Sequence, residues 1–133
     1  MKITICGSMQ FAQKMINIKQ ELESHGHQVV IPKNSDKYAS GTMSVENKWE
    51  KIELDLIKNY FEEIKKTDAV LIINENKNGV ENYIGGNGLI EMAFAHILNK
   101  KIYLLNPVPK LNYTDEIEAM QPIIINNDLK LII

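Results

Sequence analysis

Residues 68–74 read DAVLIIN, which places five apolar residues between Asp68 and Asn74. An uninterrupted apolar run of this length is typical of a parallel strand buried on both faces, because a strand with one solvated face alternates apolar and polar residues. We therefore expect 68–74 to be a central strand of a parallel sheet. The β-branched segment KITIC, at 2–6, is expected to be its central neighbour.

The segments on either side of this run alternate between strand and helix patterns. Residues 11–26 have helical periodicity and end at Gly26, a residue typical of the end of a helix. A longer amphipathic pattern predicts one helix over 45–66, with Trp49 on its apolar, core-facing side. The other expected elements are strands at 28–32, 101–106 and 122–126, a surface loop at 33–44 with room for a short helix, a helix at 87–100 and a short helix within 107–121.

This alternation predicts the class of fold. Strands that alternate with helices form a parallel sheet with right-handed crossovers, and the helices then cover both faces. We expect an α/β three-layer sandwich of the Rossmann or flavodoxin type, as a single domain over residues 1–133. A composition of 44% hydrophobic and 24% charged residues agrees with one ordinary globular domain.

Composition and charge argue against several classes of partner. A net charge of −2 gives no electrostatic basis for binding a nucleic acid polymer or an anionic membrane. We expect no signal peptide, since the apolar part of the N-terminal stretch is short, and no membrane span, since no apolar run approaches the roughly 20 residues required. A single cysteine, Cys6, favours a reducing, cytoplasmic setting and is expected in the core. The spacing of histidines and cysteine predicts no metal site, and we expect no cofactor.

Ligands of parallel α/β sheets bind beyond the carboxyl ends of the strands. Gly7 and Ser8 follow the first expected strand and precede a helix, where backbone N–H groups and the helix dipole attract an anion. A tight turn at Gly7 and a helix cap at Ser8 explain the same pair. Asp68 opens its strand at the opposite, amino edge, so we expect it to act in capping or turn formation.

Glu91 follows a glycine-rich segment, GGNG at 85–88, where an apolar helical pattern begins. If Gly88 caps this helix, Glu91 is its third residue, where a carboxylate accepts hydrogen bonds from unpaired backbone N–H groups. The same position suits a nucleophile, because a carboxylate beside a glycine loop can attack an anomeric carbon or stabilise an oxocarbenium ion. The residues alone leave both interpretations open.

Three stretches carry a family resemblance: ITICGS at 3–8, TDAVLIIN at 67–74 and GLIEMAFAHILNKKIYLLN at 88–106. Together they resemble the nucleoside 2-deoxyribosyltransferase-like superfamily, which includes the 2'-deoxynucleoside 5'-phosphate N-hydrolases. The resemblance implies a five-stranded parallel sheet, a homodimer or larger assembly, and cleavage of the N-glycosidic bond of nucleosides or nucleotides. It places the nucleophile on Glu91.

The resemblance also implies which residues hold the substrate. It places phosphate contact on Ser8, and we expect Gly7 and Met9 to share it. The sugar is expected against the glycine loop formed by Gly85, Gly86, Asn87 and Gly88.

Two positions depart from the pattern of the superfamily. Three positions before the glutamate, where the superfamily often has a hydroxyl residue, this sequence has Gly88. Eight positions before the strand-opening aspartate, where the superfamily has a second acid, this sequence has Tyr60. Asn59 beside it, or Asp55 one turn away, are the nearest substitutes.

The sequence therefore predicts an N-glycosidase or N-glycosyltransferase acting on a nucleoside 5'-monophosphate or nucleoside. A phosphoribohydrolase resembling the lonely-guy family stays open, although its PGGxGTxxE motif is one residue longer than the GGNGLIE segment found here. A non-catalytic nucleotide-binding sensor, in which Glu91 only caps a helix, also stays open. For the homodimer or larger assembly, Tyr113 and Asp115 are the expected donors to a neighbouring subunit's site.

Overall fold

A computed structural model describes residues 1–43, 49, 52 and 55–133 and has an α/β fold built on a five-stranded sheet. Every strand pair is parallel, and the strand order is β2-β1-β3-β4-β5. The strands are β1 (Lys2–Gly7), β2 (Gln28–Val30), β3 (Ala69–Ile73), β4 (Lys101–Leu104) and β5 (Ile123–Ile124). This is the order of flavodoxin-like sheets, so the expected fold class is confirmed.

The two strands expected at the centre are neighbours. Strand β1 pairs with β3 from Ile3 opposite Ala69 to Gly7 opposite Ile73, and all five residues of β3 are buried. Because the two strands are parallel and end in register, the loops that follow them leave the sheet side by side. These loops define the carboxyl edge of the sheet.

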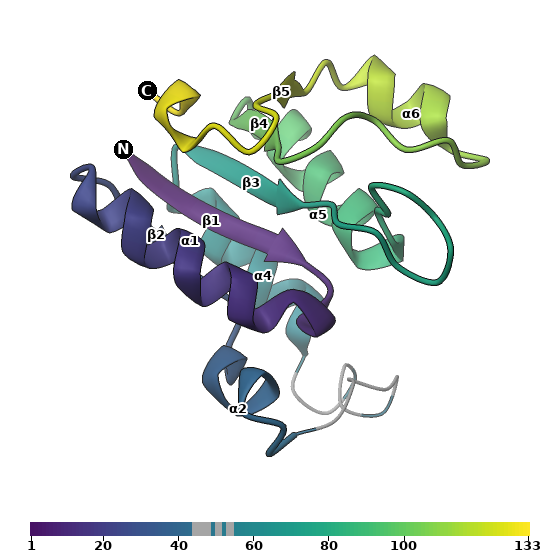
Figure 1. Cartoon of the computed structure of the whole chain (residues 1–133). Coiled ribbons are helices and arrows are strands. Elements are labelled where there is room, and N and C mark those ends of the chain that lie inside the picture. The colour runs from purple at the N-terminus through teal and green to yellow at the C-terminus, as the bar shows by residue number, and fades with distance from the viewer. Residues whose placement is uncertain (44–48, 50–51, 53–54) are drawn as a thin grey trace.

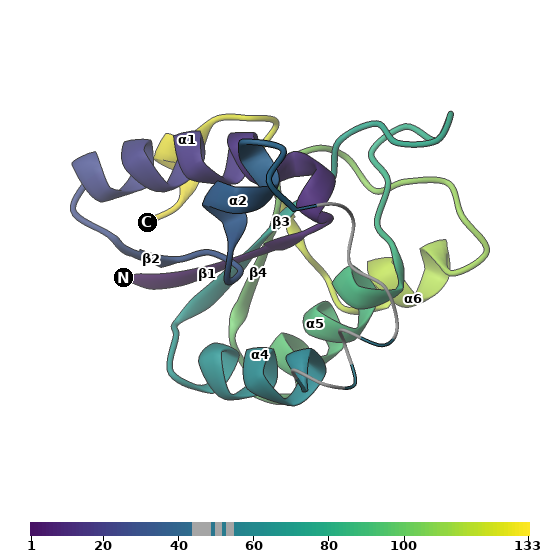
Figure 2. The same ribbon diagram turned by 90° about the horizontal axis from the view of Figure 1, so that it is seen from below.

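Helices cover both faces of the sheet, as Figures 1 and 2 show. Helix α1 lies on one face, and α4 and α5 lie on the other. The helical elements are η1 (Met9–Phe11), α1 (Ala12–Ser24), α2 (Ser35–Ala39), α4 (Leu56–Lys65), α5 (Gly86–Ile97), α6 (Thr114–Ala119) and η2 (Leu129–Leu131). In the part of the chain that the structure describes, no helix is long and apolar enough to cross a membrane.

Alternate residues of β3 supply two separate cores. Leu71 and Ile73 pack into the cluster on the α1 side of the sheet, whereas Val70 and Ile72 pack into the cluster beneath α4 and α5. Burying one such side chain stabilises the fold by about 1.5–3 kcal/mol. Both faces of β3 therefore need apolar residues, which accounts for the uninterrupted run in the sequence.

The expectation of one continuous helix over 45–66 is wrong. Asp55 has a φ of 48°, in the left-handed region that aspartate tolerates better than most residues, so α4 begins only at Leu56. Trp49, which was expected in the core, is 67% exposed, whereas Ile64 is buried as expected. The rest of this expected helix, at 45–48, 50–51 and 53–54, lies outside the described residues.

Candidate functional site

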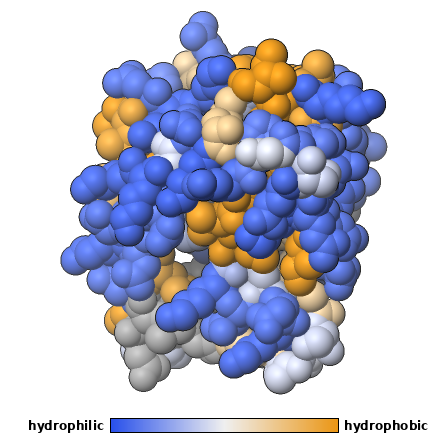
Figure 3. All heavy atoms as spheres, turned by 90° about the vertical axis from the view of Figure 1, so that its left-hand side faces the viewer, coloured by the Kyte–Doolittle hydropathy of each residue, from blue (hydrophilic) through white to orange (hydrophobic). Residues whose placement is uncertain are grey.

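Two adjoining cavities lie at the carboxyl edge of the sheet. The larger lies between the segment that follows β2 and helices α4 and α5, and the smaller lies between the end of β1 and the start of α5. Their volumes are about 750 Å³ and about 200 Å³. Gly7, Met9 and Asn87 line both, so these three residues form the boundary between them. Figure 3, which views the molecule from the side where the strands begin, shows a hollow in the surface beside hydrophobic side chains. The carboxyl edge is the one at which parallel α/β sheets bind ligands.

Gly7 brings the end of β1 very close to β3. Its φ is +153°, and a Cβ atom there would lie 3.1 Å from the carbonyl oxygen of Ile73 and 3.1 Å from the Met15 side chain. Only glycine fits this approach without displacing its neighbours. Gly7 is thus the last paired residue of β1, and it lines both cavities.

Ser8 combines the cap expected from the sequence with a contact to a cation. Its Oγ accepts a hydrogen bond from the backbone N–H of Gln10 at 3.2 Å, which caps the η1 turn. The same oxygen accepts from the Nζ of Lys77 at 2.9 Å. The Lys77 ammonium also lies 5.6 Å from the centroid of the Tyr83 ring, within the range of a cation–π contact.

Lys77 was not among the residues expected from the sequence. It lies in the loop between β3 and α5, and an isolated backbone bridge to Val80 shapes this loop. Its partner Ser8 is 69 positions away in the chain, so no local motif contains both residues. The available signal was a lone cation in a polar loop that follows a central strand.

Helix α5 starts earlier than the capping interpretation of Glu91 requires. The helix begins at Gly86 with Gly85 as its cap, so Glu91 is the sixth helical residue and not the third. A side chain in the second turn does not occupy the position from which a capping box reaches the free N–H groups. The interpretation of Glu91 as a capping residue is therefore wrong.

Gly88, the position where the resemblance implies a hydroxyl residue, lies buried inside α5. A Cβ atom at Gly88 would come within 3.2 Å of the Cγ2 atom of Ile84, closer than most packed carbon atoms. The residue thus lets α5 pack tightly onto the chain that leads into it. A serine or threonine here would require Ile84 to shift.

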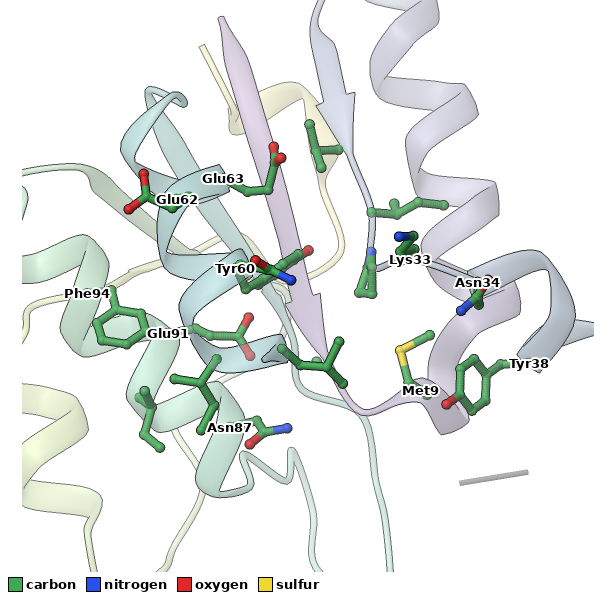
Figure 4. Close-up of a pocket in the computed structure, with 18 of the residues that line it drawn as sticks. Met9, Lys33, Asn34, Tyr38, Tyr60, Glu62, Glu63, Asn87, Glu91 and Phe94 are labelled. Carbon is green, nitrogen blue, oxygen red and sulfur yellow. The ribbon is translucent and has the colours of Figure 1, made fainter. Parts of the chain in front are cut away.

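Glu91 lines the larger cavity from α5 and lies beside Tyr60 of α4 (Figure 4). Its Oε2 atom is buried. The thiol of Cys6, in β1, donates to the carbonyl oxygen of Thr4 at 4.0 Å. Burial first, and then the proximity of Glu91, raises the pKa of Cys6 well above its ordinary value. The thiol therefore stays protonated.

Tyr60 is held in place by the backbone of β1. Its hydroxyl donates a hydrogen bond to the carbonyl oxygen of Ile5. Burial first, and then the proximity of Glu91 and Glu63, raises the pKa of Tyr60 well above its ordinary value. Tyr60 is therefore neutral at physiological pH and stands beside Glu91 as a fixed part of the cavity wall.

The structure brings together the residues that the sequence placed in a site. The larger cavity is lined by Glu91, Tyr60 and Asn59, and the smaller one by Ser8, Gly85, Gly86 and Gly88. Glu63, one turn after Tyr60, was not expected from the sequence and also lines the larger cavity.

Three other polar residues lie apart from both cavities. Asp55 lines neither of them and pairs with Lys58 at 3.8 Å on the surface. Tyr113 donates a hydrogen bond to the carbonyl oxygen of Ile84 in its own chain. Asp68 accepts from the backbone N–H of Lys2 at 2.8 Å, at the amino edge where the sequence placed it.

The comparisons with known proteins add no identification to this geometry. The sequence matches no protein-family model, and no curated protein matches it. Within the described ranges, no three His, Cys, Asp or Glu side chains gather in a way that could hold a metal ion.

Proposed function

We propose that the protein cleaves, or transfers at, the N-glycosidic bond of a nucleoside 5'-monophosphate or nucleoside, with Glu91 as the nucleophile. The observation that carries this proposal is the position of Glu91 on the wall of a cavity of about 750 Å³ that adjoins a smaller glycine-lined cavity. A nucleotide has two parts whose chemistry matches the two cavities. Its base and sugar suit the larger cavity, and its phosphate suits the loop at Gly7, Ser8 and Met9.

The reaction would proceed in two displacements at C1' of the sugar. A Glu91 carboxylate oxygen attacks C1', the C1'–N bond breaks, and its electron pair leaves with the base, which takes up a proton. Water then attacks C1' of the glycosyl ester, loses a proton and releases Glu91. A second base in place of water would make the reaction a transfer.

The surroundings of Glu91 support this role. The raised pKa values of Cys6 and Tyr60 keep both groups neutral, so neither places a second negative charge beside Glu91. A carboxylate of this kind can stabilise the positive charge that develops at C1' as the base departs.

Protonation of the leaving base calls for an acid in the same cavity. Tyr60 is poorly suited, because its proton is already donated to Ile5 and its pKa is raised. Glu63 lines the cavity from the same helix and is our candidate for this role.

Incubation of the protein with a panel of nucleosides and nucleoside 5'-monophosphates tests the proposal. We expect chromatography to detect free base together with sugar phosphate. Release of base by the Glu91→Gln variant at the wild-type rate would refute the role of Glu91. Absence of base with every compound would refute the catalytic proposal.

A nucleotide-binding sensor is the second candidate. The hydrogen bond from Tyr60 to Ile5 favours it, because the residue at the position of the superfamily's second acid serves the fold. Calorimetric binding of a nucleotide that is never cleaved would support the sensor over the enzyme.

We also propose a homodimer or larger assembly in the cytoplasm. Ile57 and Ile90 line the rim of the larger cavity and are exposed, and Ile97, further along α5, is 76% exposed. A second copy that packs on this apolar surface would also border the cavity. With the Tyr113 hydroxyl used in its own chain, the exposed Asp115 is the better donor to a neighbouring site. Light scattering that gives a monomer at micromolar concentration would refute the assembly.

A further inference from the structure

We propose that Lys77 is a specificity-determining residue at the smaller cavity, where it selects a ligand that carries a phosphate monoester. The anion site follows from the groups that line this cavity. The assignment of the anion to the 5'-phosphate of the substrate rests on the proposed function.

Lys77 fixes a positive charge at the wall of this cavity. Its Nζ is held at 2.9 Å from Ser8 Oγ and at 5.6 Å from the Tyr83 ring centroid, and both of these residues line the cavity as well. A lysine held by two contacts loses less side-chain entropy on binding an anion than a lysine that moves freely in solvent. The cation is therefore positioned in advance.

Ser8 directs a second donor into the same space. A hydroxyl oxygen can accept two hydrogen bonds and donate one. Ser8 Oγ accepts from the backbone N–H of Gln10 and from Lys77, which leaves its O–H to donate. Among the described residues, no acceptor takes this proton. A phosphate oxygen in the cavity would accept it.

The N-terminus of α5 supplies a third source of donors. The helix has 12 residues, its cap Gly85 offers no side-chain hydrogen bond, and Gly86, Asn87 and Gly88 of its first turn line the cavity. Unpaired N–H groups at such an end attract anions. None of the residues that line the cavity is acidic. The Lys77 cation, the Ser8 hydroxyl and the start of α5 thus all favour a negatively charged ligand.

The shape of the site favours a monoester over a free anion. Gly7, Met9 and Asn87 separate the smaller cavity from the larger one that holds Glu91. A phosphate with one ester oxygen can fill the smaller cavity and pass its organic part across this boundary. A Cβ atom at Gly86 would meet no atom within 4 Å, so this glycine leaves room for a phosphate oxygen to approach the backbone.

Binding measurements on the full chain test the role of Lys77. The protein is titrated by calorimetry and by amide NMR with inorganic phosphate, a nucleoside and the matching nucleoside 5'-monophosphate. We expect Lys77→Met to weaken binding of the monophosphate by about 10- to 100-fold, as for loss of a charge-assisted hydrogen bond, and to change nucleoside binding little. Inorganic phosphate should shift the amide resonances of Ser8 and Gly86.

Two further variants serve as controls. Lys77→Arg keeps the charge and should retain most of the monophosphate affinity. Lys110→Met removes an exposed lysine that lines neither cavity and should leave binding unchanged. If Lys77→Met does not fold, Lys77→Gln replaces it, because the backbone bridge between Lys77 and Val80 does not need the side chain.

The outcomes separate this inference from the proposed function. Phosphate binding that depends on Lys77, without release of base, supports the anion site and refutes the proposed enzyme. Release of base with equal weakening of nucleoside and nucleotide by Lys77→Met refutes the anion site and supports the enzyme. Failure of inorganic phosphate and of every monophosphate to bind refutes the anion site.

Discussion

The two edges of the sheet differ in what their polar groups contact. At the amino edge, Asp68 exchanges hydrogen bonds with Lys2: its Oδ2 accepts from the Lys2 backbone N–H, and its own N–H donates to the Lys2 carbonyl, both at 2.8 Å. Its carbonyl also accepts from the N–H of Lys101 at 3.2 Å. At the carboxyl edge, Ser8, Lys77 and Glu91 line cavities.

This difference shows that a carboxylate must be interpreted by the edge on which it stands. Asp68 and Glu91 both lie close to central strands, yet the backbone contacts of Asp68 join the starts of β1, β3 and β4. Glu91 stands on a helix whose start faces the ends of β1 and β3. The predictions below test this contrast between a structural edge and a functional edge.

The largest expected effect is that of Glu91→Gln on turnover. If Glu91 is the nucleophile, this near-isosteric change removes the covalent step and lowers the rate of base release by at least about 10³-fold, as removal of an essential nucleophile does elsewhere. Folding, checked by circular dichroism, and ligand binding should persist. The matched Asp68→Asn variant should release base at the wild-type rate. Equal loss of activity in both variants would contradict the contrast between the edges.

Ser8→Ala should act on the phosphorylated ligand alone. Loss of a hydrogen bond to a charged group costs about 1.5–3 kcal/mol, so nucleotide affinity should fall while nucleoside affinity stays constant. Calorimetry measures both affinities. Ser40→Ala removes an exposed hydroxyl that lines neither cavity and serves as the control. Equal weakening of nucleotide and nucleoside binding would show that Ser8 does not contact the phosphate.

Alkaline pH should destabilise the fold through Cys6 and Tyr60. Their pKa values are raised in the folded protein, so above the unfolded values of about 8.5 and about 10 the unfolded chain has lost protons that the folded protein keeps. The stability that these two groups contribute is therefore complete below about pH 8. At higher pH the free energy of unfolding falls by up to about 1.4 kcal/mol per pH unit for each group.

Urea unfolding between pH 7 and pH 10 measures this fall in stability. The Cys6→Ala variant starts from a lower stability and should show a shallower slope between about pH 8.5 and pH 10, because of these two groups only the thiol titrates in that interval. A stability that stays constant up to pH 10 in the unmodified protein would contradict the raised pKa of Cys6.

The smallest expected effect is that of Asp68→Ala at the amino edge. Removal of the carboxylate that accepts from Lys2 should lower the free energy of unfolding by about 0.5–1.5 kcal/mol and leave turnover unchanged. Thermal or urea unfolding measures the first effect, and base release measures the second. A loss of activity without loss of stability would show that the amino edge takes part in function and would contradict the contrast between the two edges.

The sheet could be predicted from the sequence because burial of its two faces leaves a local pattern of apolar residues. The apolar run in β3 reflects burial on both sides, and the alternation of strands and helices implies parallel pairing. The ends of helices were predicted less well. Nothing near Asp55 signals its positive φ, and the glycine-rich segment at 85–88 does not mark Gly86 as the first residue of α5.

The composition of the candidate site was only partly predictable. Gly7 and Ser8 stand at the end of a strand, and Glu91 follows a glycine-rich segment, so the position of each can be inferred from local signals. Lys77 and Glu63 become visible only when the chain folds, because their neighbours in the cavities come from distant segments.

The shared boundary of the two cavities has a consequence for affinity. A ligand whose two parts are joined across Gly7, Met9 and Asn87 binds as a chelate, because the first part to bind raises the effective concentration of the second. Inorganic phosphate and a free base, added together, should therefore bind far more weakly than the intact nucleotide. Cleavage of the bond between base and sugar ends this advantage for the base, so the reaction itself promotes release of its products.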